Sequence, residues 1–263
     1  MSEIRILICT RGESQYLHEL ILTLQDQISR QSEKVSLGIA CNLSDLGLLL
    51  NDIDVVTSVP SGYASTRQAA LKLRKPGEGV IFLDDDNIVQ SDWLLGLMNS
   101  TQRYPNHILK GHVNYIDEDY LRTPMLNDGL RSGKELHFAG MSNLYFPSFV
   151  VDTERFAFNL DFNQGGEDTE LTFKLWKSGY KILTLDGFPV FEIVSLNKES
   201  PDYLAKRLLD SRIVFDKVVS LHGDYFEKFK RIIPWRIKTL ISHREMQHVF
   251  QRFTQKLFFF RKK

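Results

Sequence analysis

The chain has 263 residues, 43% of them hydrophobic, with 33 Lys and Arg against 33 Asp and Glu and only two cysteines. This composition excludes wholesale disorder, which requires low hydrophobicity and a high net charge, and a net charge of zero is untypical of a dedicated nucleic-acid-binding protein. Two cysteines cannot form a disulfide framework or a zinc ribbon, so Cys9 and Cys41, both in apolar runs, are predicted to be buried free thiols in a reducing compartment.

The amino-terminal sequence does not predict a secretory signal, because Glu3 introduces an acid at once and the following apolar run is too short. No run of about 18 uncharged apolar residues occurs that would predict a membrane span. We therefore expect a cytoplasmic protein.

The first hundred residues alternate between predicted strands and helices. Strands are predicted from apolar and β-branched runs at Ile4–Cys9, Val35–Cys41, Val55–Val59 and Val80–Leu83. Helices are predicted at Glu13–Gln27, at Ser65–Arg74 before the stop signal Pro76-Gly77, and after Ser91, which could cap the helix. This order is typical of an α/β domain with a mostly parallel sheet.

The alternation loosens after Ile108. The elements predicted there are a strand at Ile108–Val113, a helix at Glu167–Ser178 ended by Gly179, strands at Lys181–Leu185 and Val190–Val194, and helical structure beyond Pro201. We expect residues 1–200 to form one domain and residues 201–263 a helical extension.

The extension carries an excess of positive charge. Between Phe226 and Lys263, Lys and Arg far outnumber the acids Glu227 and Glu245, which suggests an anionic partner. For Ile232–Ile241 we favour a helix that covers the domain, with a membrane-bound amphipathic helix as the alternative. For Phe258–Lys263, exposed phenylalanines beside a cationic terminus favour an anionic membrane surface.

Three adjacent carboxylates, Asp84-Asp85-Asp86, follow the predicted buried strand Val80–Leu83. Adjacent carboxylates repel one another unless water or a cation neutralises them, and ligands of open α/β sheets bind at the carboxyl ends of the strands. Hard oxygen ligands suit Mg²⁺ or Mn²⁺, with a ligand's phosphates completing the coordination shell. The alternative is a solvated acidic turn that caps the next helix, but the strand directly before the cluster favours a metal site.

Two further segments combine small residues with charged ones. In Gly165-Gly166-Glu167-Asp168 the acids open a predicted helix, where the dipole keeps an aspartate ionised and able to take a proton from an attacking hydroxyl. In Gly62-Tyr63-Ala64-Ser65-Thr66-Arg67 small residues open a helix carrying Arg67, a fixed cation for carboxylate or phosphate. Taken alone, each has a plainer interpretation: a simple helix N-terminus, and a surface arginine.

Together and in this order, these segments resemble the family 2 glycosyltransferases, which are nucleotide-sugar enzymes of the GT-A fold. The similarity runs from Ile4 to about Val194. It rests on Ile6–Arg11, on Gly62–Ala70, on Phe82–Asp86 followed by Ser91-Asp92-Trp93-Leu94, and on Gly165–Leu171 followed by Gly179-Tyr180-Lys181. The resemblance implies an α/β fold of the GT-A type, a mixed sheet flanked by helices, with a helical basic C-terminal extension.

The resemblance also implies a role for each matching residue. Asp86 and Asp84 would bind the divalent cation, Mn²⁺ or Mg²⁺, and Asp168 would be the catalytic base. Glu167 would orient hydroxyls of the sugar or the acceptor. The residues implied to bind the nucleotide sugar are Thr10, Arg11, Asn42, Arg67, Asp84 and Asp85.

Two positions depart from the family pattern. In Ala40-Cys41-Asn42 a thiol stands where the family commonly has an acid that contacts the nucleoside, so the expected UDP donor has dTDP and GDP donors as alternatives. Many members have a histidine metal ligand after the last strand, where this chain has Glu192. Either Glu192 replaces that histidine as a hard ligand, or it faces solvent and water completes the shell.

The implied function is an inverting, metal-dependent glycosyltransferase that moves a sugar from a nucleotide-diphospho-sugar to a hydroxyl of a saccharide or lipid-linked glycan acceptor, in cell-surface polysaccharide synthesis. Two alternatives stay open: a nucleotidyltransferase that uses the Asp84–Asp86 metal site, and a non-catalytic scaffold that binds sugar nucleotides or membranes. No nucleic-acid partner is expected. The expected location is cytoplasmic, with peripheral contact to the inner face of the cell membrane.

Overall fold

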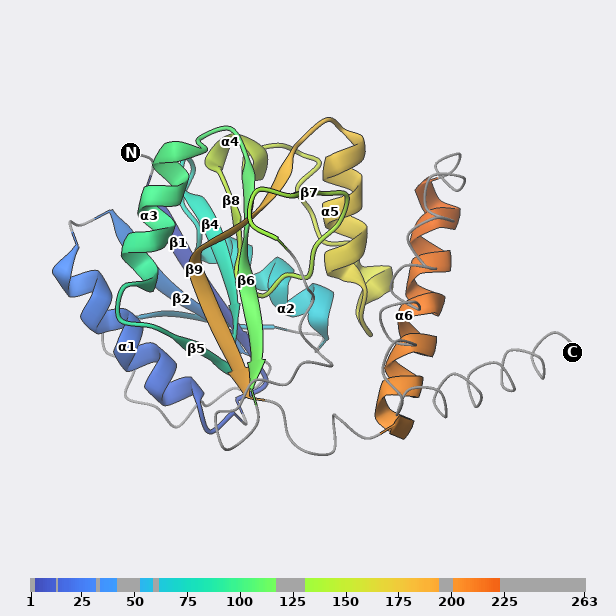
Figure 1. Ribbon diagram of the computed structural model, residues 1–263, viewed down its shortest axis with the longest axis horizontal. Helices are drawn as coiled ribbons and strands as arrows, with labels where there is room; N and C mark the ends of the chain where they lie inside the picture. The colour runs from blue at the N-terminus through green and yellow to red at the C-terminus, as the bar shows by residue number, and fades with distance from the viewer. Residues whose placement is uncertain are drawn as a thin grey trace, which may run out of the picture. The chain divides into compact units, whose positions relative to one another are not determined.

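The structure, a computed structural model, describes residues 3–12, 14–31, 34–41, 53–58, 62–116, 131–193 and 201–222 (Figure 1). The chain divides into a first unit of residues 1–116 and 127–193 and a second unit of residues 117–126 and 194–263. The expected boundary at residue 200 stays a prediction, because residues 194–200 lie outside the described ranges.

The strands of the described residues form one nine-stranded mixed sheet in the first unit. They are β1 (Ile4–Thr10), β2 (Val35–Cys41), β3 (Asp54–Thr57), β4 (Gly79–Asp84), β5 (Asn87–Val89), β6 (Ile108–Ile116), β7 (Glu135–Leu136), β8 (Leu144–Phe146) and β9 (Ile182–Ile193). The order is β3-β2-β1-β4-β8-β6-β9-β5, with β7 paired to β9. Strands β1 to β4 are parallel, whereas β8 runs antiparallel between β4 and β6.

Helices cover both faces of this sheet (Figure 1). The helices of the first unit are α1 (Leu17–Arg30), α2 (Tyr63–Ala70), α3 (Trp93–Arg103), α4 (Ser148–Val151) and α5 (Glu167–Lys177), with 3₁₀ turns η1 (Leu71–Leu73) and η2 (Leu160–Phe162). In the second unit, α6 spans Pro201–His222. No helix among the described residues is long and apolar enough to cross a membrane.

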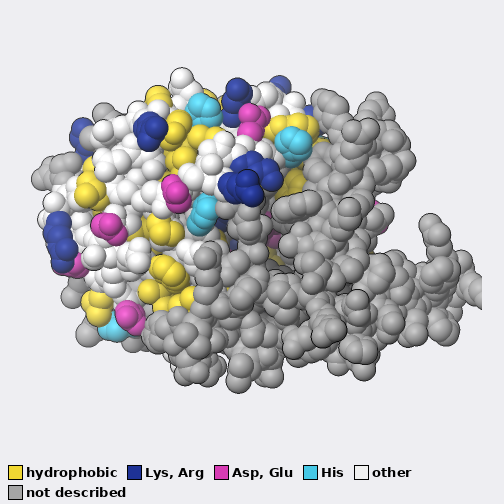
Figure 2. All heavy atoms as spheres, viewed as in Figure 1, with side chains coloured by type: hydrophobic (Ala, Val, Ile, Leu, Met, Phe, Trp, Pro, Cys, Tyr) yellow, Lys and Arg dark blue, Asp and Glu magenta, His cyan; other side chains and the backbone are white. Residues whose placement is uncertain are grey.

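The side chains of each strand point alternately to the two faces of the sheet, and this divides the core into two layers. Ile6 and Ile8 of β1 pack with α1 and α3 in one cluster, whereas Leu7 packs with α2 and α5 in the other. Successive side chains of a strand point to opposite faces, which is why one apolar run can serve both layers. On the coloured part of the face in Figure 2, charged groups of both signs are scattered among small hydrophobic patches.

Most of the predicted elements are confirmed, and one prediction differs from the structure. The strands expected at Lys181–Leu185 and Val190–Val194 are one strand, β9, which pairs with β6 on both sides of an irregularity between Gly111 and Val113. Gly187 and Pro189 lie between the two expected strands, but the bulge accommodates them without ending the pairing. The helical structure expected beyond His222 lies outside the described residues.

The expected cap of α3 by Ser91 is wrong. Asp92 occupies the cap position and makes no side-chain capping bond. Instead, the Leu94 N–H donates to Oε1 of Gln27 at 2.9 Å, and Nε2 of Gln27 donates to the Gln90 carbonyl at 2.8 Å. Gln27 is only 3% exposed, so a buried amide from α1 satisfies the amino terminus of α3.

Replacing this amide should destabilise the fold. We expect Gln27→Met to lower the free energy of unfolding by about 1–3 kcal/mol, because the buried Leu94 N–H loses its acceptor, whereas the Gln90 carbonyl keeps the Trp93 N–H as a donor. Urea denaturation measures the change, with Gln25→Met on the same helix as the control. A Gln27→Met protein as stable as the control would contradict the capping role.

Candidate functional site

The candidate site lies where parallel strands β1 and β4 end. Cys9 pairs with Asp84, so the residues that follow β1 and those that follow β4 come together at one edge of the sheet. The carboxyl ends of strands are where open α/β sheets bind ligands. The structure therefore brings Thr10 and Arg11 to the aspartate cluster, and both were implied by the family resemblance to bind the nucleotide sugar.

The aspartate cluster is tied to the loop after β1. The Thr10 hydroxyl donates to Oδ2 of Asp85, and Thr10 Oγ1 accepts from the Gly12 N–H at 2.7 Å. The Ser14 hydroxyl donates to the Asp85 carbonyl at 2.8 Å. The Asp84 N–H donates to Oδ1 of Asn87 at 3.0 Å, which holds the turn between β4 and β5.

The ionisation of Asp85 depends on its burial and on its neighbours. Burial raises the pKa of Asp85, and the charge of Asp84 adds to this, although the Thr10 hydroxyl lowers the pKa again. A nearby cation would favour the ionised form of Asp85, which its burial and the charge of Asp84 oppose. All three aspartates are half-buried, so they are neither sealed in the core nor fully solvated.

The donor set suits Mg²⁺ or Mn²⁺, which are commonly held by one or two carboxylates together with a ligand's phosphates. Across the part of the chain that the structure describes, no cluster of three or more His, Cys, Asp and Glu side chains is assembled for a metal ion. Glu192 of β9 lies opposite Asn87 of β5, the residue that follows Asp86 in the chain. Its role as a ligand stays a prediction.

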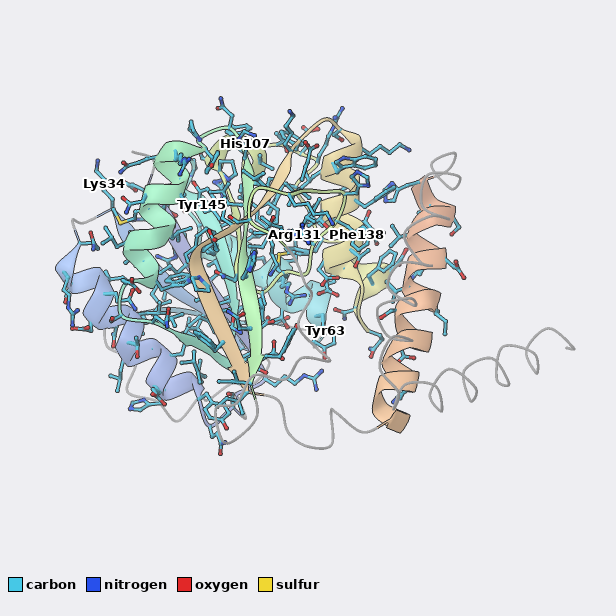
Figure 3. The ribbon with its side chains drawn as sticks, viewed as in Figure 1. Lys34, Tyr63, His107, Arg131, Phe138 and Tyr145 are labelled. Carbon is cyan, nitrogen blue, oxygen red and sulfur yellow. The ribbon has the colours of Figure 1, made fainter. Side chains whose placement is uncertain are left out.

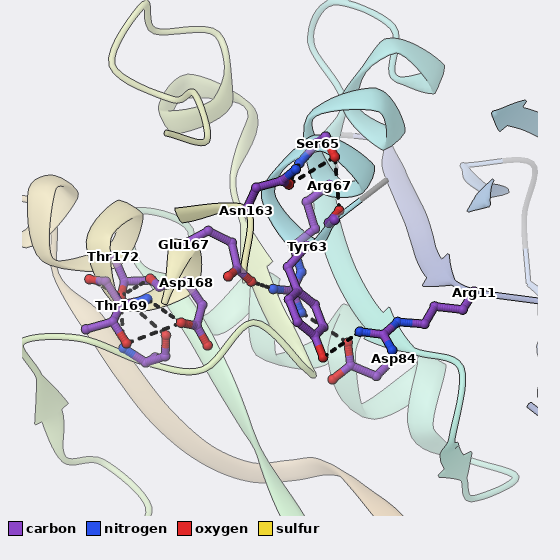
Figure 4. Close-up of polar contacts among 12 residues, drawn as sticks. Arg11, Tyr63, Ser65, Arg67, Asp84, Asn163, Glu167, Asp168, Thr169 and Thr172 are labelled. Carbon is purple, nitrogen blue, oxygen red and sulfur yellow. Dashed lines mark hydrogen bonds and ion pairs between the residues drawn. The ribbon is translucent and has the colours of Figure 1, made fainter. Parts of the chain in front are cut away.

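Arg67 is not a surface residue: it is 8% exposed and bound to two carboxylates. Its guanidinium donates to Oδ1 of Asp84 at 3.2 Å and also pairs with Oε1 of Glu167, which is 2% exposed (Figure 4). Burial lowers the pKa of Arg67, but the charges of Asp84 and Asp168 raise it, and the net effect is upward. The group is therefore a permanent cation among the site's carboxylates.

The catalytic candidate Asp168 lies in the first turn of α5. Gly165 and Gly166 precede it with φ of 128° and 88°, a backbone that only glycine adopts readily. Oδ1 of Asp168 accepts from the Thr169 N–H at 2.6 Å and from its hydroxyl at 3.2 Å. A Cβ on Gly140 would lie 3.7 Å from the other oxygen, Oδ2, so the backbone of Gly140 passes beside this carboxylate.

The remaining sequence candidates lie at the rim or outside the description. Arg11 is exposed, donates to the Tyr63 hydroxyl at 3.0 Å and stacks on its ring at 5.2 Å. Tyr63, labelled in Figure 3, opens α2 and is 45% exposed. Asn42, predicted to contact the nucleotide, lies outside the described residues.

Two asparagines that the sequence did not single out connect segments around the site. Asn143, fully buried at a φ of 54°, donates through Nδ2 to the Phe188 carbonyl at 2.8 Å and accepts from Nε1 of Trp93 at 3.2 Å. Asn163 accepts through Oδ1 from the backbone and hydroxyl of Ser65, at 2.9 and 3.0 Å. Neither asparagine stands in a recognisable motif. The residues that each one binds lie far away in the sequence, so no local pattern indicates these contacts.

The thiol of Cys9 sits directly beside the aspartates. Burial raises its pKa to about 12, and the charges of Asp84 and Asp85 act in the same direction, whereas Arg67 opposes them. Cys41 is fully buried, and both cysteines are free. The expectation of buried thiols is thus confirmed for Cys41, while Cys9 is partly buried but held in its neutral form.

Both thiols should resist alkylation in the folded protein. At pH 8 a thiol with a pKa near 12 is almost entirely neutral, so iodoacetamide should modify Cys9 roughly a thousandfold more slowly than in the urea-unfolded chain. Mass spectrometry over time gives the rate for each cysteine separately. Rapid modification of Cys9 at pH 8, with the fold intact, would contradict this electrostatic description.

Comparisons with known proteins show the fold. No protein-family profile and no curated protein sequence matches the chain. Among solved structures, GalNAc-T7 with UDP, GalNAc and Mn²⁺ matches with a TM-score of 0.58 and 15% identity, over 78% of this chain and 47% of that one. Staphylococcus aureus TarS 1-349 with UDP-GlcNAc matches with a TM-score of 0.59 and 14% identity, over 81% and 65%.

The chain has the GT-A fold. A second TarS structure gives a TM-score of 0.59 at 15% identity, covering 81% of this chain and 39% of that one. The present chain therefore spans less than two thirds of the length of each of these proteins. The GT-A fold confirms the expected mixed sheet flanked by helices.

Proposed function

We propose that the protein is an inverting, divalent-metal-dependent glycosyltransferase that moves a sugar from a nucleotide-diphospho-sugar donor to a hydroxyl of a saccharide acceptor. The observation that supports it is the connection of the aspartates after β4 to the first turn of α5. Arg67 bridges Asp84 and Glu167, and Asp168 is the next residue along the chain. A cation site and a base thus lie within one site on a GT-A fold.

On the donor side, the loop after β1 and the aspartate cluster would bind the nucleotide sugar. Thr10 and Arg11 flank the cluster, and Asp85 is fixed by the Thr10 hydroxyl. UDP is the proposed nucleotide, with dTDP and GDP as the alternatives. The similar GalNAc-T7 and TarS structures contain UDP and UDP-GlcNAc, which supports the choice of UDP.

Asp86 and Asp84 would hold the Mn²⁺ or Mg²⁺ ion, with Glu192 as the third ligand. When bound, such an ion stabilises the negative charge that grows on the departing diphosphate. The chain's own contribution is to keep two carboxylates, at the end of β4 and in the following turn, close to the sheet edge. The Asn87 side chain fixes this turn, because its Oδ1 accepts from the Asp84 N–H and from the Ser142 hydroxyl at 2.8 Å.

Asp168 would act as the general base. Its carboxylate takes the proton of the acceptor hydroxyl while the hydroxyl oxygen forms a bond to the anomeric carbon. The bond from that carbon to the diphosphate oxygen breaks, and its electron pair leaves with the nucleoside diphosphate. Attack opposite the leaving group inverts the anomeric configuration, so this reaction needs no nucleophilic side chain.

The proposed acceptor is a saccharide, free or linked to a lipid, in the synthesis of a cell-surface polysaccharide. The basic sequence between Phe226 and Lys263 supports contact with an anionic membrane surface, since lysine and arginine near phenylalanine favour such surfaces. These residues lie outside the described ranges. A cytoplasmic location at the inner face of the membrane is part of the same proposal.

Release of nucleotide from a donor panel tests the proposal. The protein is incubated with UDP-, GDP-, dTDP- and CMP-sugars and a saccharide acceptor mixture, with Mn²⁺ or with EDTA. We expect release from one donor only with Mn²⁺, and Asp168→Asn should reduce the rate by about 10²–10⁴-fold, because it removes the base. Asp26→Asn, at an exposed carboxylate on α1, is the control and should leave the rate unchanged.

Each alternative predicts a different pattern. A nucleotidyltransferase would consume nucleoside triphosphates and tolerate Asp168→Ala. A scaffold would bind a nucleotide sugar in calorimetry, would release no nucleotide from it, and would be indifferent to Asp168→Asn. Failure to bind any donor in the presence of Mn²⁺ would refute the transferase proposal.

A further inference from the structure

One buried arginine joins two segments that the proposed reaction needs at a set distance. Asp84 is the last residue of β4, and Glu167 is the first residue of α5. Arg67 of α2 pairs with both, and Figure 4 shows the three side chains in one row with Asp168 beside Glu167. A planar guanidinium with donors along two edges suits two carboxylates at once, which a lysine ammonium does not.

A second contact joins α2 to the segment that leads into α5. The Tyr63 N–H donates to the Asn163 carbonyl at 3.0 Å, and Oδ1 of Asn163 accepts from the Ser65 N–H at 2.9 Å. A Cβ at Gly62 would lie 2.3 Å from the Asn163 side chain, so the segment before α5 packs directly on the amino terminus of α2. Arg67 then fastens α5 itself, about one turn further along α2.

Arg67 and Glu167 are both buried, and this makes each the required partner of the other. Arg67 is 8% exposed and Glu167 is 2% exposed, so neither has bulk water as an alternative partner. A buried carboxylate requires a counterion, and Arg67 provides it for Glu167. The carboxylate of Asp168 extends from the same helical turn, so a shift of that turn would displace the base. A displacement of about 1 Å can cost on the order of a hundredfold in rate.

We propose that Arg67 is a positioning residue, which holds Asp84 and Glu167 together and thereby places Asp168, and that Glu167 is its buried counterion rather than a ligand of the sugar or the acceptor. This proposal rests on the transferase function proposed above. It assigns Arg67 and Glu167 roles that differ from those implied by the family resemblance, in which both contact the substrates.

A double-mutant cycle tests the proposal on the full chain. The proteins are wild type, Arg67→Met, Glu167→Gln and the double variant, each measured for donor kcat and KM and for urea unfolding. We expect Arg67→Met to lower kcat about 100-fold while the donor KM changes less than about threefold, because the base is displaced and the donor contacts remain. Adding Glu167→Gln to Arg67→Met should cost nothing further, since it removes a carboxylate that has lost its counterion.

Arg74→Met is the matched control. Arg74 also pairs with an aspartate, Asp152, and its side chain is 12% exposed, but the pair joins η1 to the end of α4, away from the aspartate cluster. This variant should leave kcat and KM unchanged. If Arg67→Met does not fold, Glu167→Gln and Arg67→Lys replace it, and both should lower kcat without raising the donor KM.

Three results would overturn the proposal. A donor KM raised tenfold or more by Arg67→Met, at unchanged kcat, would make Arg67 a donor ligand. Losses in kcat that multiply in the double variant would mean that Glu167 acts on substrate independently of Arg67. Finally, the double-mutant cycle could show that Arg67 and Glu167 are coupled in the free energy of unfolding, while the wild-type protein neither binds nor converts any donor. That result would refute the transferase function separately and leave the ion pair a purely structural link.

Discussion

The rest of the site depends on the placement of one positive charge among several negative ones. The carboxylates that follow β4 and those that open α5 would repel each other if they approached alone. The guanidinium of Arg67 contacts one carboxylate from each group and is shielded from water. Because Arg67 is on α2, whose small residues pack closely on the sheet, the sheet edge and α5 share one rigid support.

The same construction recurs around the site: a polar side chain from one segment satisfies the backbone of a distant one. Gln27 of α1 caps α3, Asn163 caps α2, and Asn143 connects β8 to β9. Each of these amides is a buried or half-buried group whose loss would leave backbone donors or acceptors unpaired. The turn after β4 and the segment that leads into α5 are held by specific hydrogen bonds of this kind as well as by apolar packing.

Local sequence patterns were sufficient for the central strands and for the position of the charged clusters. The apolar runs of β1, β2 and β4 predicted buried parallel strands, because both faces of such strands are covered by helices. The sequence patterns failed where contacts with a distant segment override the conformational preference of the local residues. Gly187 and Pro189 resemble a strand break, yet β6 holds both halves of β9 in one strand. Ser91 resembles a cap, yet the buried amide of Gln27 occupies that role.

The sequence by itself determined that carboxylates follow a buried strand and open a glycine-preceded helix, since both are local features of a few adjacent residues. It also determined that Arg67 lies on a helix of small residues. Only the tertiary structure decided that Arg67 pairs with Asp84 and Glu167, and that the Asn163 side chain caps the start of α2. Such pairings depend on which strand ends and helix ends the sheet order brings together, and no local pattern of residues encodes that order.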